Sequence, residues 1–226
     1  MRPAIRRSIR NLKVSPTLAI NQKIKEMRTR GMEVFNLAFG QSPFPVHPLI
    51  QEEVIKHTNK NMYLPVKGLP ELKNVALKYL AKKYGLDPDF YLHIVGSGSK
   101  NILFNTQFAI EGDLLLSVPS WVSYEPQAMI LNDSIIKIPT KIEDNYHLTG
   151  EILEHAILQA RLEGKNPRKL ILNSPNNPTG LSMSNQQAQE VMDVCKKYGI
   201  IVITDEIYYQ VQFHQRHRAL AFYNRS

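Results

Sequence analysis

Cysteine is almost absent from this sequence, which has one such residue, Cys195, among 226. A single thiol cannot form a disulfide within the chain, and scarce cysteine is typical of proteins from a reducing compartment. Cys195 shares one face of an expected helix with Val191 and Met192, so we expect a buried, inert thiol. We therefore expect a cytoplasmic location.

Long apolar stretches are missing as well. No run approaches the roughly 20 residues that a membrane-spanning helix requires, so we expect no membrane partner. The composition, 43% hydrophobic and 21% charged residues, is that of a globular protein. The length allows one large domain, or one domain with part of another.

Acidic residues are scarce only at the start of the chain. Residues 1–30 hold nine of the 28 Lys/Arg but one of the 20 acids, so residues 31–226 hold 19 of each sign. The formal charge of +8 thus comes from a basic arm, and we expect no nucleic-acid partner. This arm also resembles an organelle transit peptide, but we favour a solvated arm. No apolar segment follows it, so a secretory signal peptide is not expected.

From about residue 70, helical and strand patterns alternate. Helices are expected over 70–84, 102–110, 124–131, 151–163 and 185–198, and strands over 93–95, 114–118, 134–138, 169–173 and 200–204. The strand runs are continuously apolar, as in parallel strands covered on both faces. We therefore predict an α/β fold, a mostly parallel sheet with helices on both faces. Upstream, a helix over 16–30 and a short strand over 33–38 are expected.

The candidate functional residues lie at the carboxyl ends of the expected strands. Ligands of open parallel sheets bind at these ends. Ser99 and Lys100 begin a helix after a Gly-Ser turn, and a helix start can bind a phosphate. A simple helix cap is the commoner role of such a turn. Trp121, the only tryptophan, follows a strand and offers a flat ring, although core packing explains it equally well.

Two further motifs follow later strands. Asn177 lies in a turn, Asn-Asn-Pro-Thr-Gly, that two prolines and a glycine make rigid. Asp205 ends a buried strand, where a carboxylate needs a cation or a hydrogen-bond donor. A pyridinium N–H is such a partner, whereas a helix-capping role is the alternative. Tyr208, three residues on, can reach the same ligand if a helical turn begins there.

In this order and spacing the segments resemble the class I/II aminotransferases, which are pyridoxal-phosphate enzymes of fold type I, the aspartate-aminotransferase-like fold. The resemblance runs from the helix at Pro16 to Tyr208. It implies that residues 1–45 form an N-terminal arm and part of a small domain. Residues 46–226 would then be an incomplete pyridoxal-phosphate-binding large domain.

The resemblance also assigns roles around the cofactor. It implies that Asp205 pairs with the ring nitrogen and that Tyr208 and Asn177 bond to the ring's phenolic oxygen. Asp205 and Tyr208 are therefore the expected catalytic residues. Trp121 would stack on the ring. No metal site is expected.

Other roles concern the phosphate, the substrate and the partner subunit. Ser99 and Lys100 would bind the phosphate through their backbone amides. Tyr63 resembles the family tyrosine that reaches a phosphate across a subunit interface, which implies a homodimer with shared sites. Gly40 resembles the glycine near the substrate carboxylate, where backbone approaches ligand closely.

One family feature has no counterpart. The Schiff-base lysine lies in a Ser-x-x-Lys-like stretch beyond the aspartate–tyrosine pair, but none of the 18 residues after Tyr208 is a lysine. Residues 97–100 match that spacing but lie at the expected phosphate site. We thus expect that this chain alone does not transaminate. The hypotheses are an aminotransferase acting on an amino acid and a 2-oxo acid, a β-eliminating lyase of the same fold, or a non-catalytic cofactor-binding fragment.

Overall fold

The computed structural model describes residues 4–10, 12–37, 40, 42–85, 87–211 and 219–224. The chain forms two compact units. One comprises residues 1–12 with 70–226, and the other comprises residues 13–69. The domain boundary expected at residue 45 stays a prediction.

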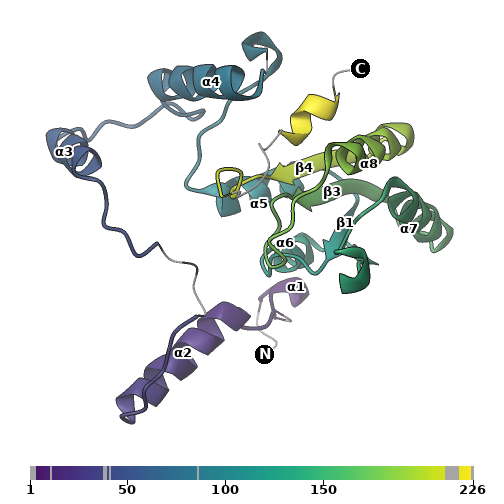
Figure 1. Cartoon of the computed structure of the whole chain (residues 1–226), viewed down its shortest axis with the longest axis horizontal. Helices are drawn as coiled ribbons and strands as arrows, with labels where there is room; N and C mark the ends of the chain where they lie inside the picture. Colours follow the sequence, from purple (N-terminus) through teal and green to yellow (C-terminus); the bar gives the residue numbers. More distant parts are fainter. Residues whose placement is uncertain are drawn as a thin grey trace. The chain divides into compact units, whose positions relative to one another are not determined.

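A four-stranded parallel sheet is the centre of the larger unit (Figure 1). Its strands are β1 (Asp113–Val118), β2 (Ile135–Pro139), β3 (Pro167–Asn173) and β4 (Ile201–Asp205), in the order β2–β1–β3–β4. Since every neighbouring pair is parallel, the carboxyl ends of all four strands lie at one edge. The predicted parallel α/β sheet is confirmed.

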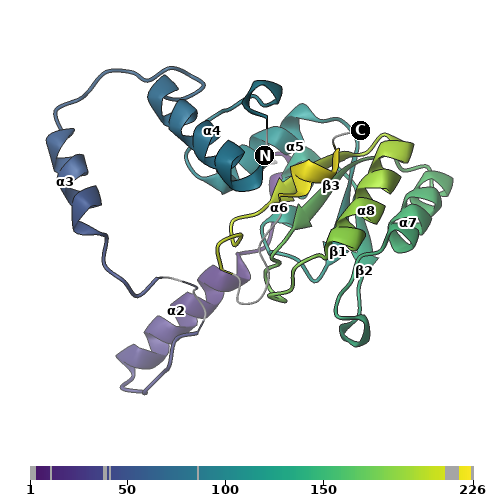
Figure 2. The ribbon, with the colours of Figure 1, turned by 45° about the horizontal axis from the view of Figure 1, so that its top comes forward.

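Helices cover both faces of this sheet (Figure 2). The helices of the larger unit are α1 (Arg7–Arg10), α4 (Pro70–Tyr84), α5 (Ser99–Ala109), α6 (Tyr124–Leu131), α7 (Gly150–Leu162) and α8 (Asn185–Tyr198), with short 3₁₀ turns at Pro88–Phe90, Ile142–Asp144 and Leu220–Asn224. No helix among the described residues is long and apolar enough to span a membrane.

Alternation along the strands divides the core into two layers. Leu115 and Leu170 face α7 and α8, where they pack with Ile157. Leu114 and Leu116 point the opposite way, toward α5 and α6. Each central strand is therefore buried on both faces, which explains its continuously apolar sequence. Cys195 of α8 is buried in the first layer, as predicted, and burial raises the pKa of its thiol to about 12.

Helix predictions agree well with the structure, whereas two strand predictions are wrong. The helices predicted over 70–84, 124–131 and 185–198 have those bounds, while α5 begins three residues earlier than predicted. Residues 93–95 form no strand, and Ile94 is 64% exposed. Residues 33–37 are also irregular, and Ala38 lies outside the described residues. Neither segment pairs with a described strand, and a β conformation depends on such a ladder.

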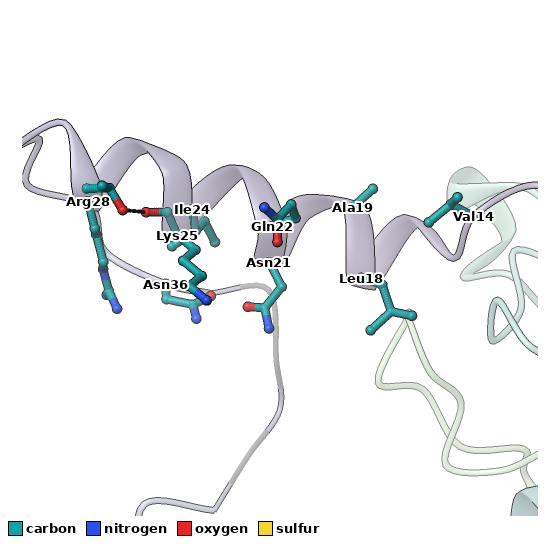
Figure 3. A pocket seen from close by; sticks show the side chains of 10 residues that line it. Val14, Leu18, Ala19, Asn21, Gln22, Ile24, Lys25, Arg28 and Asn36 are labelled. Atoms are coloured by element: carbon teal, nitrogen blue, oxygen red, sulfur yellow. Dashed lines mark hydrogen bonds between the residues drawn. The ribbon is translucent and has the colours of Figure 1, made fainter.

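The unit of residues 13–69 contains α2 (Pro16–Thr29) and α3 (Pro48–Lys56). Both helices begin with proline, whose fixed φ suits a first helical position. A groove along α2 is lined by residues of this unit alone, among them Leu18, Lys25 and Asn36 (Figure 3). No described residue of the unit is buried, so it has little core of its own.

Candidate active site

The paired ends of β3 and β4 form the base of the candidate site. Asn173 and Asp205, the last residues of these strands, are register partners. The Asn173 side-chain amide donates to the backbone oxygen of Asp205 at 2.8 Å, and the Ser174 N–H donates to the same oxygen at 3.2 Å. The parallel ladder and these two bonds therefore fix both strand ends at one level.

Asp205 presents a buried carboxylate at this edge, with 8% of the residue exposed. The Tyr124 hydroxyl donates to its Oδ2 at 2.8 Å, and the Ile207 N–H donates to its Oδ1 at 3.2 Å. These donors offset part of the cost of removing a carboxylate from water. Each oxygen keeps further acceptor capacity, since a carboxylate offers about four lone-pair positions.

Tyr124 is a buried hydroxyl whose protonation is secured by its surroundings. Burial is the main cause that raises its pKa far above the ordinary tyrosine value, and the neighbouring Asp205 charge adds to the effect. Ionising Tyr124 would place a second negative charge beside the carboxylate. The hydroxyl therefore remains a donor and orients Asp205.

The Asn-Asn-Pro-Thr-Gly turn brings a second amide to the site. The Asn177 N–H donates to the side-chain oxygen of Asn173 at 2.7 Å, which ties the turn to the end of β3. Within the turn, the Gly180 N–H donates to the Asn176 carbonyl at 2.7 Å, with Gly180 at a φ of +73°. Held in this way, the Asn177 side-chain amide donates to the Tyr208 hydroxyl at 3.2 Å.

Trp121 connects this group to the start of α5. Its ring meets the Tyr124 ring edge-on, at 5.3 Å between centroids and 74° between planes. The Lys100 ammonium lies 5.1 Å from the Trp121 ring centroid, within cation–π range. Contacts therefore run from Lys100 through Trp121 and Tyr124 to Asp205.

The start of α5 offers backbone donors beside Lys100. Gly98 precedes the helix at a φ of +85°, and the first helical bond runs from the Ile102 N–H to the Gly98 carbonyl at 3.4 Å. The N–H groups of Ser99, Lys100 and Asn101 therefore lack partners inside the helix. Together with the positive end of the helix dipole, they form an arrangement that suits an anion.

The structure thus brings six of the eight predicted site residues into one unit. These are Ser99, Lys100, Trp121, Asn177, Asp205 and Tyr208. Gly40 and Tyr63 belong to the other unit, and their roles stay predictions. A Cβ added at Gly40 would have no atom within 4 Å, and Tyr63 is fully exposed.

Two members of the site were missed by sequence reasoning. Asn173 is the last residue of a predicted strand, and only the β3–β4 register shows that it bonds to Asp205. Tyr124 opens a predicted helix three residues after Trp121, and that proximity was the available signal. Its partner lies 81 positions away in the sequence.

The chain thus has a parallel sheet with these polar and aromatic groups at its carboxyl edge, and its sequence matches a known family of proteins. The profile of the family "Aminotransferase class I and II" matches residues 32–224. The chain belongs to this family.

Individual relatives of the chain are also named as aminotransferases. The chain is 31% identical over 213 residues to a probable aspartate/prephenate aminotransferase of Aquifex aeolicus, with 92% of this chain and 52% of the relative covered. It is 30% identical over 220 residues to an aspartate aminotransferase of Bacillus sp., with 95% and 54% covered. The chain spans about half the length of the curated relatives that it matches.

Solved structures show the same fold. The aspartate aminotransferase of Thermus thermophilus with maleate superposes with a TM-score of 0.88 at 25% identity, covering 98% of this chain and 58% of that one. The aspartate aminotransferase of Rhizobium meliloti gives 0.83 at 26% identity, with 98% and 55% covered.

Proposed function

We propose that this protein is a pyridoxal-phosphate-dependent aminotransferase that transfers an amino group between an amino acid and a 2-oxo acid. The observation that carries the proposal is the unbroken series of contacts along the carboxyl edge of the sheet. It joins the start of α5, Trp121 and Tyr124 to the buried carboxylate of Asp205. Asn173 continues it from Asp205 to the Asn177–Tyr208 pair.

The donors and acceptors of this edge fit the cofactor. A pyridinium N–H needs a carboxylate partner, and Asp205 is a buried one with acceptor capacity to spare. A phenolic oxygen needs donors, which Tyr208 and Asn177 supply. A phosphate monoester needs several N–H groups, which the α5 start presents at Ser99 and Lys100.

Each residue then has a defined task. When bound, the cofactor supplies an electron sink for the pair left at the substrate Cα after its proton leaves. Asp205 holds a proton on the ring nitrogen, because the charged pair favours the protonated form. Tyr124 orients that carboxylate, and Trp121 offers its ring for stacking. Tyr208 and Asn177 hold the phenolic oxygen.

Tyr63 and Gly40 are the two candidate site residues of the smaller unit. Tyr63 is fully exposed, and Met62, Leu64 and Val66 around it are exposed as well. Large exposed apolar stretches mark interaction surfaces. On this ground we propose that Tyr63 lies at a homodimer interface and reaches the partner's phosphate. From the resemblance to the family, we also propose that Gly40 lies near the substrate carboxylate. A cytoplasmic enzyme is consistent with the single buried cysteine.

Ligand binding to the chain tests the cofactor proposal. Pyridoxamine 5′-phosphate, which has no aldehyde to react with surface lysines, is titrated against the protein with calorimetric detection. Asp205→Asn removes the negative charge that pairs with the ring nitrogen, so we expect binding to weaken at least tenfold. Asp193→Asn, on the exposed face of α8 and bonded to Gln189, is the matched control and should bind normally. Equal binding by both variants would refute the role of Asp205.

The reaction products distinguish an aminotransferase from a β-eliminating lyase. Incubation of the active enzyme with aspartate and a 2-oxo acid should yield a new amino acid, whereas release of ammonia and pyruvate from cystathionine would identify a β-eliminating lyase. Cofactor binding by the natural protein without turnover of either substrate would indicate a non-catalytic role.

A further inference from the structure

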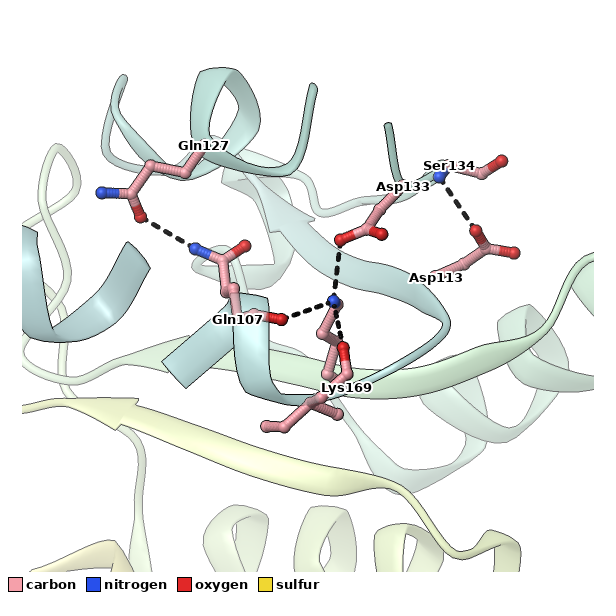
Figure 4. Close-up of polar contacts among 7 residues, drawn as sticks. Gln107, Asp113, Gln127, Asp133, Ser134 and Lys169 are labelled. Atoms are coloured by element: carbon pink, nitrogen blue, oxygen red, sulfur yellow. Dashed lines mark hydrogen bonds and ion pairs between the residues drawn. The ribbon is translucent and has the colours of Figure 1, made fainter. Parts of the chain in front are cut away.

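Two buried glutamines lie between α5 and α6. Gln107 of α5 is 0% exposed and Gln127 of α6 is 7% exposed. The Gln107 amide donates to the side-chain oxygen of Gln127 at 2.8 Å (Figure 4). The Gln127 amide then donates to the backbone oxygen of Lys100 at 2.9 Å. Among the described residues, the Gln107 side-chain oxygen is buried without a hydrogen-bond partner. An incompletely bonded buried amide is costly, so stability alone does not explain the pair and its bonds point to a specific task.

The partners fix the orientation of the Gln127 side chain. Gln107 donates to it, so the oxygen of Gln127 must face Gln107 and its NH₂ must face Lys100. The backbone of Gln107 is also held, because its carbonyl oxygen accepts a hydrogen bond from the Lys169 ammonium at 3.1 Å (Figure 4). The amide of Gln127 is therefore aimed at the first turn of α5.

We propose that Gln127 is a positioning residue for the phosphate-binding first turn of α5. This inference rests on the proposed function, which places the cofactor phosphate at that turn. The carbonyl of Lys100 and the N–H of Asn101 belong to one peptide unit. Donation to the carbonyl polarises the unit and strengthens the N–H as a donor, as in any hydrogen-bonded chain. That N–H has no partner inside the helix and follows those of Ser99 and Lys100, so in this proposal the added polarity strengthens the same set of donors.

The decisive variant replaces both glutamines, as Gln107→Met with Gln127→Met. Methionine matches glutamine in length, and removal of both members leaves neither amide buried without its partner. The bond to Lys100 is lost, while the helical hydrogen bonds of α5 remain. Gln159→Met is the control, because Gln159 is an exposed helical glutamine whose amide bonds to Glu163.

Three probes are titrated against the unmodified chain and each variant: inorganic phosphate, pyridoxamine 5′-phosphate and pyridoxamine. We expect the double variant to bind the two phosphate-bearing probes about two- to fourfold more weakly, because loss of the polarising bond weakens a charge-assisted hydrogen bond by roughly 10–30%. Pyridoxamine, which lacks the phosphate, should bind as before. The Asn101 amide proton should move upfield in a ¹H–¹⁵N spectrum of the free variant, because its peptide is less polarised.

A second variant guards against a simple folding defect. Gln127→Glu keeps the acceptor for Gln107 but turns an oxygen toward the Lys100 carbonyl. It should weaken phosphate binding more than the double variant does, while its far-ultraviolet circular dichroism stays native.

The outcomes separate the two proposals. Unchanged phosphate binding in the double variant, or an equal loss for all three probes, would overturn the positioning role and leave the proposed function standing. Phosphate binding that depends on Gln127, with no gain from the pyridoxamine ring, would support the positioning role and count against the proposed function. Failure of the unmodified chain to bind inorganic phosphate at α5 would overturn the positioning role.

Discussion

Lys169 offers a sharp test of what stabilises the larger unit. Its side chain is fully buried, and its ammonium donates to the Asp133 carboxylate at 2.7 Å and to the backbone oxygens of Gln107 at 3.1 Å and Ile110 at 2.8 Å. All three of its protons are therefore used. Lys169→Met keeps the apolar stem but leaves a carboxylate and two carbonyls without their donor. Breaking a buried ion pair from one side costs about 3–5 kcal/mol, and because the Asp133 side chain is 18% exposed, we expect a loss of about 3 kcal/mol in the free energy of unfolding.

Urea denaturation followed by circular dichroism measures this loss. Lys165→Met is the matched control, because the Lys165–Glu163 pair is partly exposed at 2.7 Å and should contribute little. Adding Asp133→Leu to Lys169→Met removes the unpaired charge and should restore much of the lost stability. A loss below about 1 kcal/mol for Lys169→Met, or no recovery in the double variant, would show that the buried pair does not act as reasoned.

Three further predictions concern single groups. The pKa of Tyr124 is raised in the folded chain, so its contribution to stability is complete below the ordinary tyrosine pKa near 10 and is lost as pH rises above that value. Between about pH 10 and 12, the free energy of unfolding should therefore fall less steeply in Tyr124→Phe than in the unmodified chain. Equal slopes for the two proteins would contradict this. Burial raises the pKa of Cys195 to about 12, so its thiol should not react with Ellman's reagent at about pH 8 until the chain is unfolded, and rapid native labelling would refute the assignment. Ser184→Ala removes the capping box at the start of α8, formed with Gln187, and should cost about 1 kcal/mol in thermal unfolding, whereas Ser184→Asn should retain most of that stability.

Helices were predictable because residues at or next to each helix end determine where the helix begins and ends. Pro70 starts α4 at its first position, and Ser184 and Gly199 bound α8 as its N-cap and its left-handed C-cap. Strands depend on partners elsewhere in the chain. Residues 93–95 carry β-branched Ile94 and Val95, as β4 carries Ile201, Val202 and Ile203, but no described strand pairs with them. The local sequence does not indicate whether a partner strand is available.

The candidate site was predictable where a residue ends a strand and carries unusual chemistry. Asp205 met both conditions, and its burial follows the prediction. Tyr124 did not, because its role depends on a carboxylate brought close by the fold. Gln107 and Gln127 were missed for a different reason: helical glutamines are mostly solvent-exposed, so sequence alone gives no cause to pair two of them inside a core.

The shared register of Asn173 and Asp205 also predicts where evolution can change the length of this chain. One residue inserted within β4 would bring Thr204 to the level of Asn173 and turn the side chains that follow the insertion to the opposite face. The carboxylate would then leave the Tyr124 hydroxyl, even with every site residue retained. Residues 140–149, by contrast, connect β2 to α7 by a mostly exposed path and can absorb extra residues without moving a strand. Insertions and deletions in homologous genes should therefore cluster in such connections and be absent from Ile201–Asp205.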